Sequence, residues 1–484
     1  MQTPLPRSRG RFSCALGSIA LSNPFRNILR LATGDFISKA LSFLAFVYLA
    51  RVLGVSEFGV LEFAGSILTY LLLISDGGLE MWGTREAAKA GDLPALVKRV
   101  LPYRLLLASG SFALLLVVLP LFPHYPSLRV VMVLYAVDVF AQAISLKWAF
   151  MGQQDMSRVA RGLVIGQMLF ALAVFGLIHN AAGLVWVPVL RLAGDLATAI
   201  YFARWYRRIH GHLPLQVKFS GLALGPALTL GLSQAMGLIN YNFDSVLLGF
   251  LRGPTVVGWY NAAYKLILIS VTPTLTYVVG LFPALSRSYA ESREEFRHLM
   301  ARSVELWLAY VVPLVVGGVF LADSIIHFLY GTAYANSAAP LRILVWSAAL
   351  ASLRMVYSNA LRATGHQALD LRCAIASAAL NVVLNVLFIP RYGMVGAASA
   401  TVSADVIWFA ASYYFFARVV LPGEPMPKLR GPLLGGLAMA VVLWVARPVV
   451  WPARAILGLA TYALILIILG GFSLRQYLQK PPGA

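Results

Sequence analysis

Apolar stretches of about 20 residues recur along almost the whole chain, and they limit the fold more than any other feature of the sequence. A stretch of this length crosses roughly 30 Å of hydrocarbon as an α-helix, which satisfies its own backbone hydrogen bonds there. Only 12% of the 484 residues are charged, whereas soluble proteins average about 25%. The sequence therefore predicts an all-α integral membrane protein without a soluble domain.

We expect about fourteen transmembrane helices. The predicted spans are 25–53, 57–80, 100–122, 129–150, 160–179, 184–203, 221–251, 255–285, 303–329, 338–360, 370–390, 394–418, 431–447 and 453–474. When these spans alternate from a cytoplasmic N-terminus, most of the 39 Lys and Arg residues fall on the inner side. Cytoplasmic loops are enriched in basic residues, so both termini are predicted to be cytoplasmic. The same rule accounts for the net charge of +20 without a nucleic-acid partner.

The first 24 residues have the basic start and short apolar run of a signal peptide. We interpret them as a cytoplasmic or interfacial tail, because the run is short and a full span follows it. The two cysteines, Cys14 and Cys373, lie near the predicted cytoplasmic side, so no disulfide is expected.

An internal repeat relates the two halves of the chain. The stretch LGVSEFGVLEFA is similar to RGPTVVGWYNAA, and it aligns Gly54, Gly59 and Ala64 with Gly253, Gly258 and Ala263. This order predicts a parallel repeat of six spans, with a substrate path between the two lobes. The expected units are a tail at 1–24, an N-terminal six-helix lobe at 25–219, a C-terminal six-helix lobe at 220–420, and a terminal helix pair with its tail at 421–484.

Three stretches carry the pattern of a known family. They are LARVLGVSEFGVLEFAGSILTYLLLISDGGLEMWGTRE (49–86), FDSVLLGFLRGPTVVGWYNAAYKLI (243–267) and NVVLNVLFIPRYGMVGAASATVSADV (381–406). In combination they resemble the polysaccharide-biosynthesis flippases, in particular the O-antigen (Wzx-type) flippases. These belong to the multidrug/oligosaccharidyl-lipid/polysaccharide exporter superfamily.

The resemblance implies a flippase and not an enzyme. Such a protein moves undecaprenyl-diphosphate-linked oligosaccharides, the precursors of O-antigen or exopolysaccharide, from the inner to the outer leaflet of the bacterial inner membrane by alternating access. Its partners would be the lipid-linked oligosaccharide, membrane lipids, and a polysaccharide polymerase with chain-length proteins. No nucleic acid is expected.

Charged side chains inside the predicted spans are the candidate site residues, because an isolated charge in a bilayer costs at least about 2.5 kcal/mol. A diphosphate head carries about two negative charges and needs cations in a wet cavity. The expected substrate-binding residues are Lys39, Arg191, Lys265 and Arg354. Lys147 and Arg342 lie near span ends, where such side chains usually extend to the interface.

Acidic side chains in the spans would neutralise these cations or carry a coupling H⁺ or Na⁺; no other cofactor is expected. The candidates are Asp35, Asp138, Asp195 and Asp244. Asp35 with Lys39, and Arg191 with Asp195, are four residues apart on one helix face, so pairing alone could explain each couple. Tyr241, Tyr260 and Tyr264 could stack on sugars, although packing is the commoner role of such residues.

Two other functions remain open. A cation-coupled small-molecule exporter of the same superfamily would be favoured by a cavity with a net acidic lining. A membrane polymerase or ligase would need a sizeable outer loop, and the predicted outer loops are short. The sequence has no metal-binding or phosphate-binding motif of an enzyme.

Overall fold

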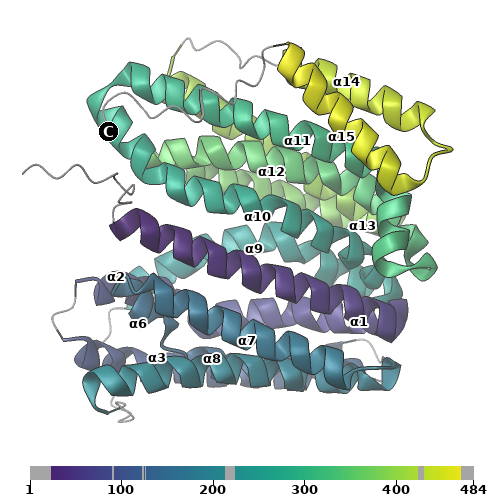
Figure 1. The fold of residues 1–484 in the computed structure, drawn as a ribbon. Helices are drawn as coiled ribbons and strands as arrows, with labels where there is room; N and C mark the ends of the chain where they lie inside the picture. Colours follow the sequence, from purple (N-terminus) through teal and green to yellow (C-terminus); the bar gives the residue numbers. More distant parts are fainter. Residues whose placement is uncertain are drawn as a thin grey trace, which may run out of the picture.

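The computed structural model describes residues 23–89, 92–122, 125, 127–212, 224–422 and 430–469. These residues form helices and connecting turns and contain no strand, which confirms the predicted fold class (Figure 1). Ten of their segments are long and apolar enough to cross a membrane. The protein is therefore a multi-pass membrane protein, while the exact number of spans stays a prediction.

The helices are α1 (Asn23–Asp76), α2 (Leu79–Ala87), α3 (Leu93–Val118), α4 (Leu128–Ala136), α5 (Asp138–Ile144), α6 (Lys147–Gly152), α7 (Met156–Leu177), α8 (Trp186–His210), α9 (Leu224–Arg252), α10 (Pro254–Glu291), α11 (Arg293–Tyr330), α12 (Ala338–Ala363), α13 (Gln367–Phe415), α14 (Arg430–Val445) and α15 (Trp451–Ile468). Short 3₁₀ helices are η1 (Leu119–Leu121), η2 (Ala181–Val185) and η3 (Thr332–Ser337), and η4 (Phe416–Val420) is a π-helical turn.

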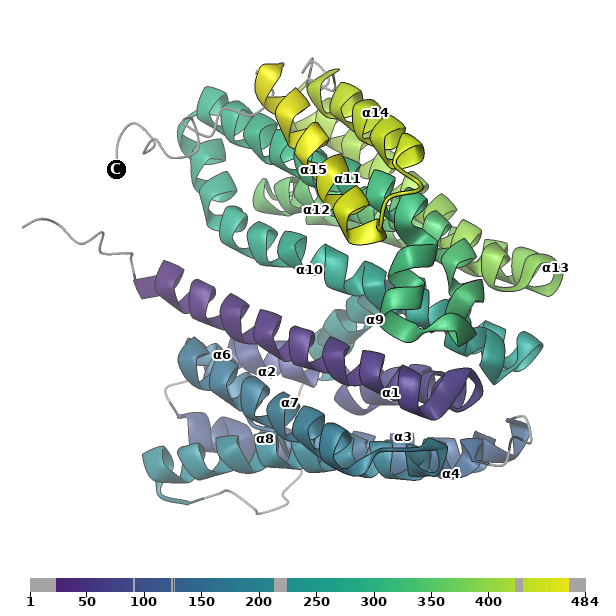
Figure 2. The same ribbon diagram turned by 45° about the vertical axis from the view of Figure 1, so that its right-hand side comes forward.

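Two long helices, α1 and α13, are each divided by a glycine. Gly54 has φ 77° and ψ 171°, and Gly393 has φ 56° and ψ −131°, so neither is helical. A positive φ of this kind is strained for residues with a Cβ atom, which is why glycine stands at both positions. Each helix therefore contains two of the predicted spans, and Figure 2 shows α1 turning back at its far end.

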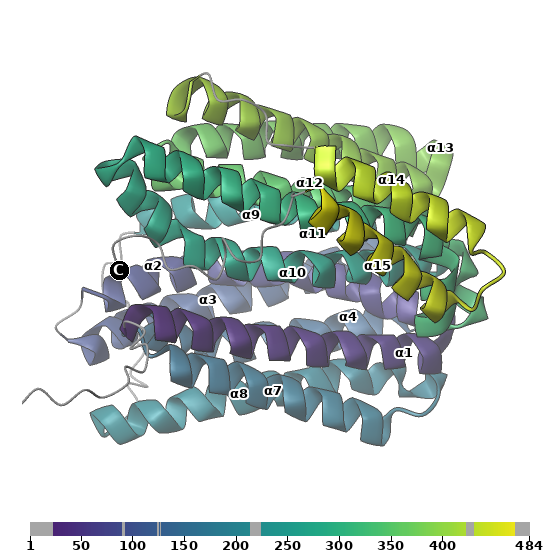
Figure 3. The ribbon, with the colours of Figure 1, turned by 45° about the horizontal axis from the view of Figure 1, so that its top comes forward.

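The repeat is visible in the backbone. Gly253, the repeat partner of Gly54, has φ 83° and ψ 172°, nearly the same conformation. The next pair of repeat glycines lies at the contact between α1 and α10, which run side by side (Figures 1 and 3). A Cβ atom on Gly59 would lie 1.8 Å from the Pro254 carbonyl oxygen, and one on Gly258 would lie 2.3 Å from that of Val55. The two halves thus meet backbone to backbone through residues of the repeat.

A second close contact joins the halves at the C-terminal end of α1, where α2 follows, far from the turn at Gly54. We call this the α2 end. A Cβ atom on Gly78 would lie 2.0 Å from the carbonyl oxygen of Ala227 in α9. A Cβ atom on Gly231, also in α9, would lie 2.9 Å from the backbone nitrogen of Gly78. The N-terminal half (23–212) and the C-terminal half (224–422) therefore touch near both ends of the bundle, on either side of the cavity described below.

The predicted span 129–150 matches a segment, Leu128–Gly152, that is long and apolar enough to cross a membrane, but this segment is not one continuous helix. The chain forms α4, α5 and α6, with an extended residue at Ser145 (ψ 125°) between α5 and α6. Arg104 of α3 donates hydrogen bonds to the carbonyl groups of Ser145 (3.1 Å) and Gln142 (3.0 Å). The guanidinium therefore satisfies acceptors that the interruption frees from helical bonding.

The terminal helices α14 and α15 pack against each other and against α11 (Figures 1 and 3). Their contact is apolar and includes Leu321, Met439, Leu443, Tyr462 and Leu466. The predicted lobe boundary at 219/220, residues 1–22 of the predicted tail at 1–24, and the C-terminal residues from 470 lie outside the described residues. Cys373 is a buried free thiol, and Cys14 also lies outside the described part of the chain.

Candidate functional site

A polar cavity of about 380 Å³ lies between the two halves. Its wall is built by α1, α4 and α8 of the N-terminal half and by α9 and α10 of the C-terminal half. The polar and aromatic lining residues include Glu62, Arg191, Tyr241, Tyr264 and Lys265. Two of the four predicted cations therefore lie in one cavity, which we call the central cavity.

Lys265 of α10 reaches across the interface between the halves. Its Nζ lies 3.1 Å from Oε2 of Glu62 in α1 and 3.7 Å from the ring centroid of Phe46. The side chains of Lys265 and Glu62 are only 19% and 10% exposed, so a carboxylate and an aromatic face stabilise the ammonium in a largely dry site.

Sequence reasoning did not place Glu62 in the site, although it is an acid within a predicted span. The repeat carried a signal for this pair. Gly59 and Gly258 meet at the interface, and Glu62 and Lys265 follow them by about one and two helical turns, respectively.

Arg191 lies between two carboxylates. Its Nε is 3.7 Å from Oδ2 of Asp195 and 3.9 Å from Oδ2 of Asp138. Asp195 is the predicted partner on the same helix, while Asp138 comes from α5 and is fully buried. Neither carboxylate oxygen of Asp138 accepts a hydrogen bond in the structure. A buried acid without a donor is costly when it is ionised.

The charged groups around Arg191 and Lys265 are net acidic when all of them are ionised, although Asp138 and Asp195 do not themselves line the central cavity. Arg191 and Lys265 supply two positive charges, and three carboxylates lie within 4 Å of them: Glu62, Asp138 and Asp195. The sequence predicted Asp195 as a partner of Arg191, but it did not predict Glu62 as the partner of Lys265.

Arg354 lies behind the wall of the central cavity. It is buried, donates a hydrogen bond to the hydroxyl of Tyr241 (3.1 Å), and stacks 3.6 Å over the ring of Trp408. Tyr241 stands between Arg354 and the cavity, since Tyr241 lines it and Arg354 does not.

Asp244 lies inside the C-terminal half and does not line the central cavity. It accepts hydrogen bonds from the hydroxyls of Tyr260 and Thr401 (3.3 Å) and from the backbone of Ser245 (2.7 Å). Tyr260 is fully buried by this contact, so among the three tyrosines only Tyr241 and Tyr264 face the cavity.

Lys39 and Asp35 pair within the first half of α1. Their charged atoms are 2.7 Å apart, and both side chains are 40% exposed. Neither residue lines the central cavity. The structure thus brings Arg191 and Lys265 together and leaves Lys39 apart from them.

A second cavity, of about 460 Å³, lies at the α2 end. It shares Thr69, Leu72 and Leu238 with the central cavity, so the two spaces adjoin. We call it the α2 cavity.

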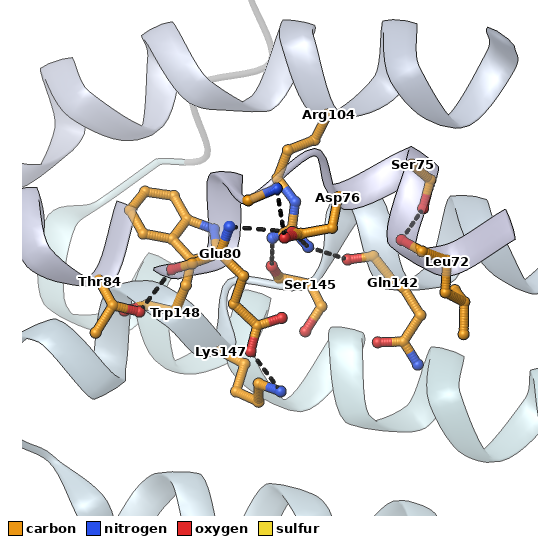
Figure 4. A network of polar contacts seen from close by, with 11 residues as sticks. Leu72, Ser75, Asp76, Glu80, Thr84, Arg104, Gln142, Ser145, Lys147 and Trp148 are labelled. Carbon is orange, nitrogen blue, oxygen red and sulfur yellow. Dashed lines mark hydrogen bonds and ion pairs between the residues drawn. The ribbon is translucent and has the colours of Figure 1, made fainter. Parts of the chain in front are cut away.

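Four charged side chains form a network at the α2 cavity (Figure 4). Arg104 lies 3.5 Å from Asp76, and Nζ of Lys147 lies 2.7 Å from Oε1 of Glu80. Lys147 pairs with Glu80 just after the break before α6, and its expected position at the membrane interface stays a prediction. Arg342 likewise pairs with Asp323.

A family comparison decides the identity of the chain. The model of the family described as "Polysaccharide biosynthesis protein" matches residues 25–289, which is more than half of the chain. The chain belongs to this family. A second family model, MatE, matches residues 230–387, and the resemblance drawn from the sequence motifs is confirmed.

Two curated relatives match over most of their length. The "Probable low-salt glycan biosynthesis flippase" of Haloferax volcanii is 22% identical over 415 residues, covering 78% of this chain and 80% of that protein. The "Succinoglycan biosynthesis transport protein ExoT" of Rhizobium meliloti is 23% identical over 433 residues, covering 85% and 83%.

A solved structure shares the fold. The structure titled "Lipid II flippase MurJ, inward closed conformation" has a TM-score of 0.76 at 15% identity, covering 93% of this chain and 100% of that chain. At this identity the similarity concerns the fold alone.

Proposed function

We propose that this protein is a flippase for undecaprenyl-diphosphate-linked oligosaccharides, the precursors of O-antigen or exopolysaccharide. One observation carries the proposal: Arg191 and Lys265 lie in a cavity between two halves related by a repeat. The relatives named for glycan and succinoglycan transport support a transport role and not an enzymatic one. The membrane is the bacterial inner membrane, with both termini in the cytoplasm.

The charge on the cargo explains why cations are needed. A diphosphate would lose most of its hydration in the central cavity, and only charge-assisted hydrogen bonds can replace it. Arg191 offers a planar guanidinium that matches two phosphate oxygens, whereas Lys265 offers a compact ammonium. The head group would displace Glu62 from Lys265 and take its place.

Transport would follow alternating access. The halves touch near both ends of the bundle, at Gly59 with Gly258 and at Gly78 with Gly231, and the central cavity lies between these contacts. Opening the α2 end would admit the head group from the cytoplasm, and opening the other end would release it outside. The lipid tail stays in the bilayer throughout.

Proton uptake would accompany binding of the diphosphate. Arg191 faces Asp138 on α5, Asp195 on α8, Tyr135 on α4 and Glu62 on α1. A dianion added to this acidic set meets repulsion that a proton on Asp138 or Asp195 removes. Asp244 in the C-terminal half is the alternative site for a coupling H⁺ or Na⁺, and Asp35 has the role of neutralising Lys39.

A second candidate is export of small organic cations. The net acidic set of Glu62, Asp138 and Asp195 around two cations favours it. A polymerase or ligase remains the least supported alternative. A polymerase and chain-length proteins would instead act next to this protein on the product that it delivers.

Cargo preference separates the two candidates. The full-length protein is reconstituted in liposomes loaded either with lipid-linked oligosaccharide or with ethidium, an organic cation. We expect oligosaccharide to become accessible to an added glycosidase in a protein-dependent way, without ethidium movement. Ethidium movement alone would support the exporter and exclude the flippase.

A further inference from the structure

The α2 cavity contains groups that the central site does not use. We propose that it is a binding subsite for an uncharged sugar of the lipid-linked substrate, with Glu80 and Gln142 as its hydrogen-bonding residues and Lys147 as the ion-pair partner of Glu80. The inference rests on the proposed function, since it assigns a place to the sugar next to the diphosphate.

Two of the four charged residues in the network form hydrogen bonds to backbone groups. Arg104 binds the carbonyl groups of Gln142 and Ser145 at the break between α5 and α6. Asp76 accepts hydrogen bonds from the backbone N–H groups of Gly78 (3.1 Å) and Glu80 (3.0 Å) at the start of α2. These residues have a structural role that fixes the shape of the cavity.

The other two charged residues keep hydrogen-bonding capacity. The contact between Glu80 and Lys147 uses one carboxylate oxygen and one of three ammonium hydrogens. The side chain of Glu80 is 33% exposed and lines the cavity, whereas that of Lys147 is 28% exposed and does not line it. In Figure 4 the Gln142 carboxamide lies on the same side of the Arg104 guanidinium as this pair.

The charges of the four-residue network balance. Asp76 and Glu80 are opposed by Arg104 and Lys147, so the network has no net charge and does not favour an ion. A sugar hydroxyl both donates and accepts, so it can donate a charge-assisted hydrogen bond to the carboxylate of Glu80. Gln142 adds a donor and an acceptor of the kind that an N-acetyl group binds.

The position fits a sugar attached to a diphosphate. Thr69, Leu72 and Leu238 line both cavities, so a molecule can occupy the two at once. The volume of about 460 Å³ lies in the range of roughly 300–1,000 Å³ found for small-molecule pockets. The sugar would lie toward the α2 end and the diphosphate near Lys265.

The test compares two lipids for binding to the full-length protein in nanodiscs. One is the lipid-linked oligosaccharide extracted from cells that make the protein, and the other is polyprenyl diphosphate without sugar. Wild-type protein should bind the sugar-bearing lipid more tightly. Glu80→Gln and Gln142→Met should each weaken binding of that lipid about tenfold, the loss of one charge-assisted or well-placed hydrogen bond, and leave binding of the bare diphosphate unchanged.

A matched control lies on the same helix. Glu86 of α2 pairs with Lys89 at 3.2 Å and does not line the α2 cavity, so Glu86→Gln should bind both lipids like wild type. Thermal unfolding of each variant checks that the fold is kept.

Each outcome has a separate meaning. Equal affinity of the wild-type protein for the two lipids, or an equal loss for both lipids in Glu80→Gln and Gln142→Met, would overturn the sugar subsite alone. Failure of the wild-type protein to bind either lipid would overturn the proposed function itself.

Discussion

Replacing Glu62 by glutamine tests whether Lys265 is held ready for an anion. The variant keeps the shape of the side chain and removes the carboxylate that occupies the ammonium. We therefore expect tighter binding of polyprenyl diphosphate, because the ligand no longer competes with an internal anion.

The structure sets the size of the effect. At the observed 3.1 Å and an effective dielectric constant of about 20, two unit charges attract by roughly 5 kcal/mol. The glutamine oxygen still accepts a hydrogen bond worth about 1 kcal/mol, and desolvation of Lys265 offsets most of the remainder. The net gain should be about 1.4 kcal/mol, which is a tenfold lower Kd.

Stability should change in the opposite direction. The variant leaves Lys265 without its counter-charge, so Glu62→Gln should unfold at a lower temperature than wild type, and polyprenyl diphosphate should restore more stability in the variant. Binding is measured by microscale thermophoresis in nanodiscs, and unfolding by intrinsic fluorescence. Glu57→Gln is the control, because Glu57 lies on α1 but binds the Ser127 hydroxyl. An unchanged or weaker affinity in Glu62→Gln would refute the reasoning.

Three further changes address the fold and the coupling. Gly258→Ala should destabilise the protein by about 1–3 kcal/mol through overpacking, because the new Cβ would lie 2.3 Å from a carbonyl oxygen of α1. Gly280→Ala is the control, since Gly280 has open space around it, and thermal unfolding compares the two variants. Arg104→Lys should cost about 1–3 kcal/mol because a lysine cannot bind two carbonyl groups in a fork, and unchanged thermal stability would contradict that role. Diphosphate affinity should rise as pH falls, because protonation removes negative charge beside Arg191. Asp138→Asn should make affinity depend less on pH. An equally steep pH profile in the variant would exclude Asp138 as the proton acceptor.

The sequence was sufficient to predict an all-α membrane protein, while the number of spans stays a prediction. Apolar length decides which segments can cross the bilayer, and the glycines mark where the backbone must leave the helix, as Gly54 and Gly393 show. The break at Ser145 was missed because no glycine or proline marks it, and its stabilising residue, Arg104, lies on another helix.

The site was harder to predict than the fold. Pairs within one helix, such as Asp35 with Lys39, follow from spacing alone. The ion pair between Lys265 and Glu62 depends on how the two halves pack, so the spacing of residues within one helix does not predict it. In the sequence, only the repeat glycines that meet at the interface indicate this pair. The same packing decides that Arg191 faces the central cavity and that Lys39 does not line it.

The most direct test of the central claim is the translocation rate of lipid-linked oligosaccharide in liposomes containing wild-type protein or Lys265→Ala. Loss of a charged hydrogen bond to the diphosphate, about 1.5–3 kcal/mol, should slow transport by roughly tenfold to a hundredfold. Lys39→Ala provides the comparison for a cation outside the central cavity. A rate for Lys265→Ala equal to that of the wild-type protein would contradict the claim that this cavity receives the diphosphate.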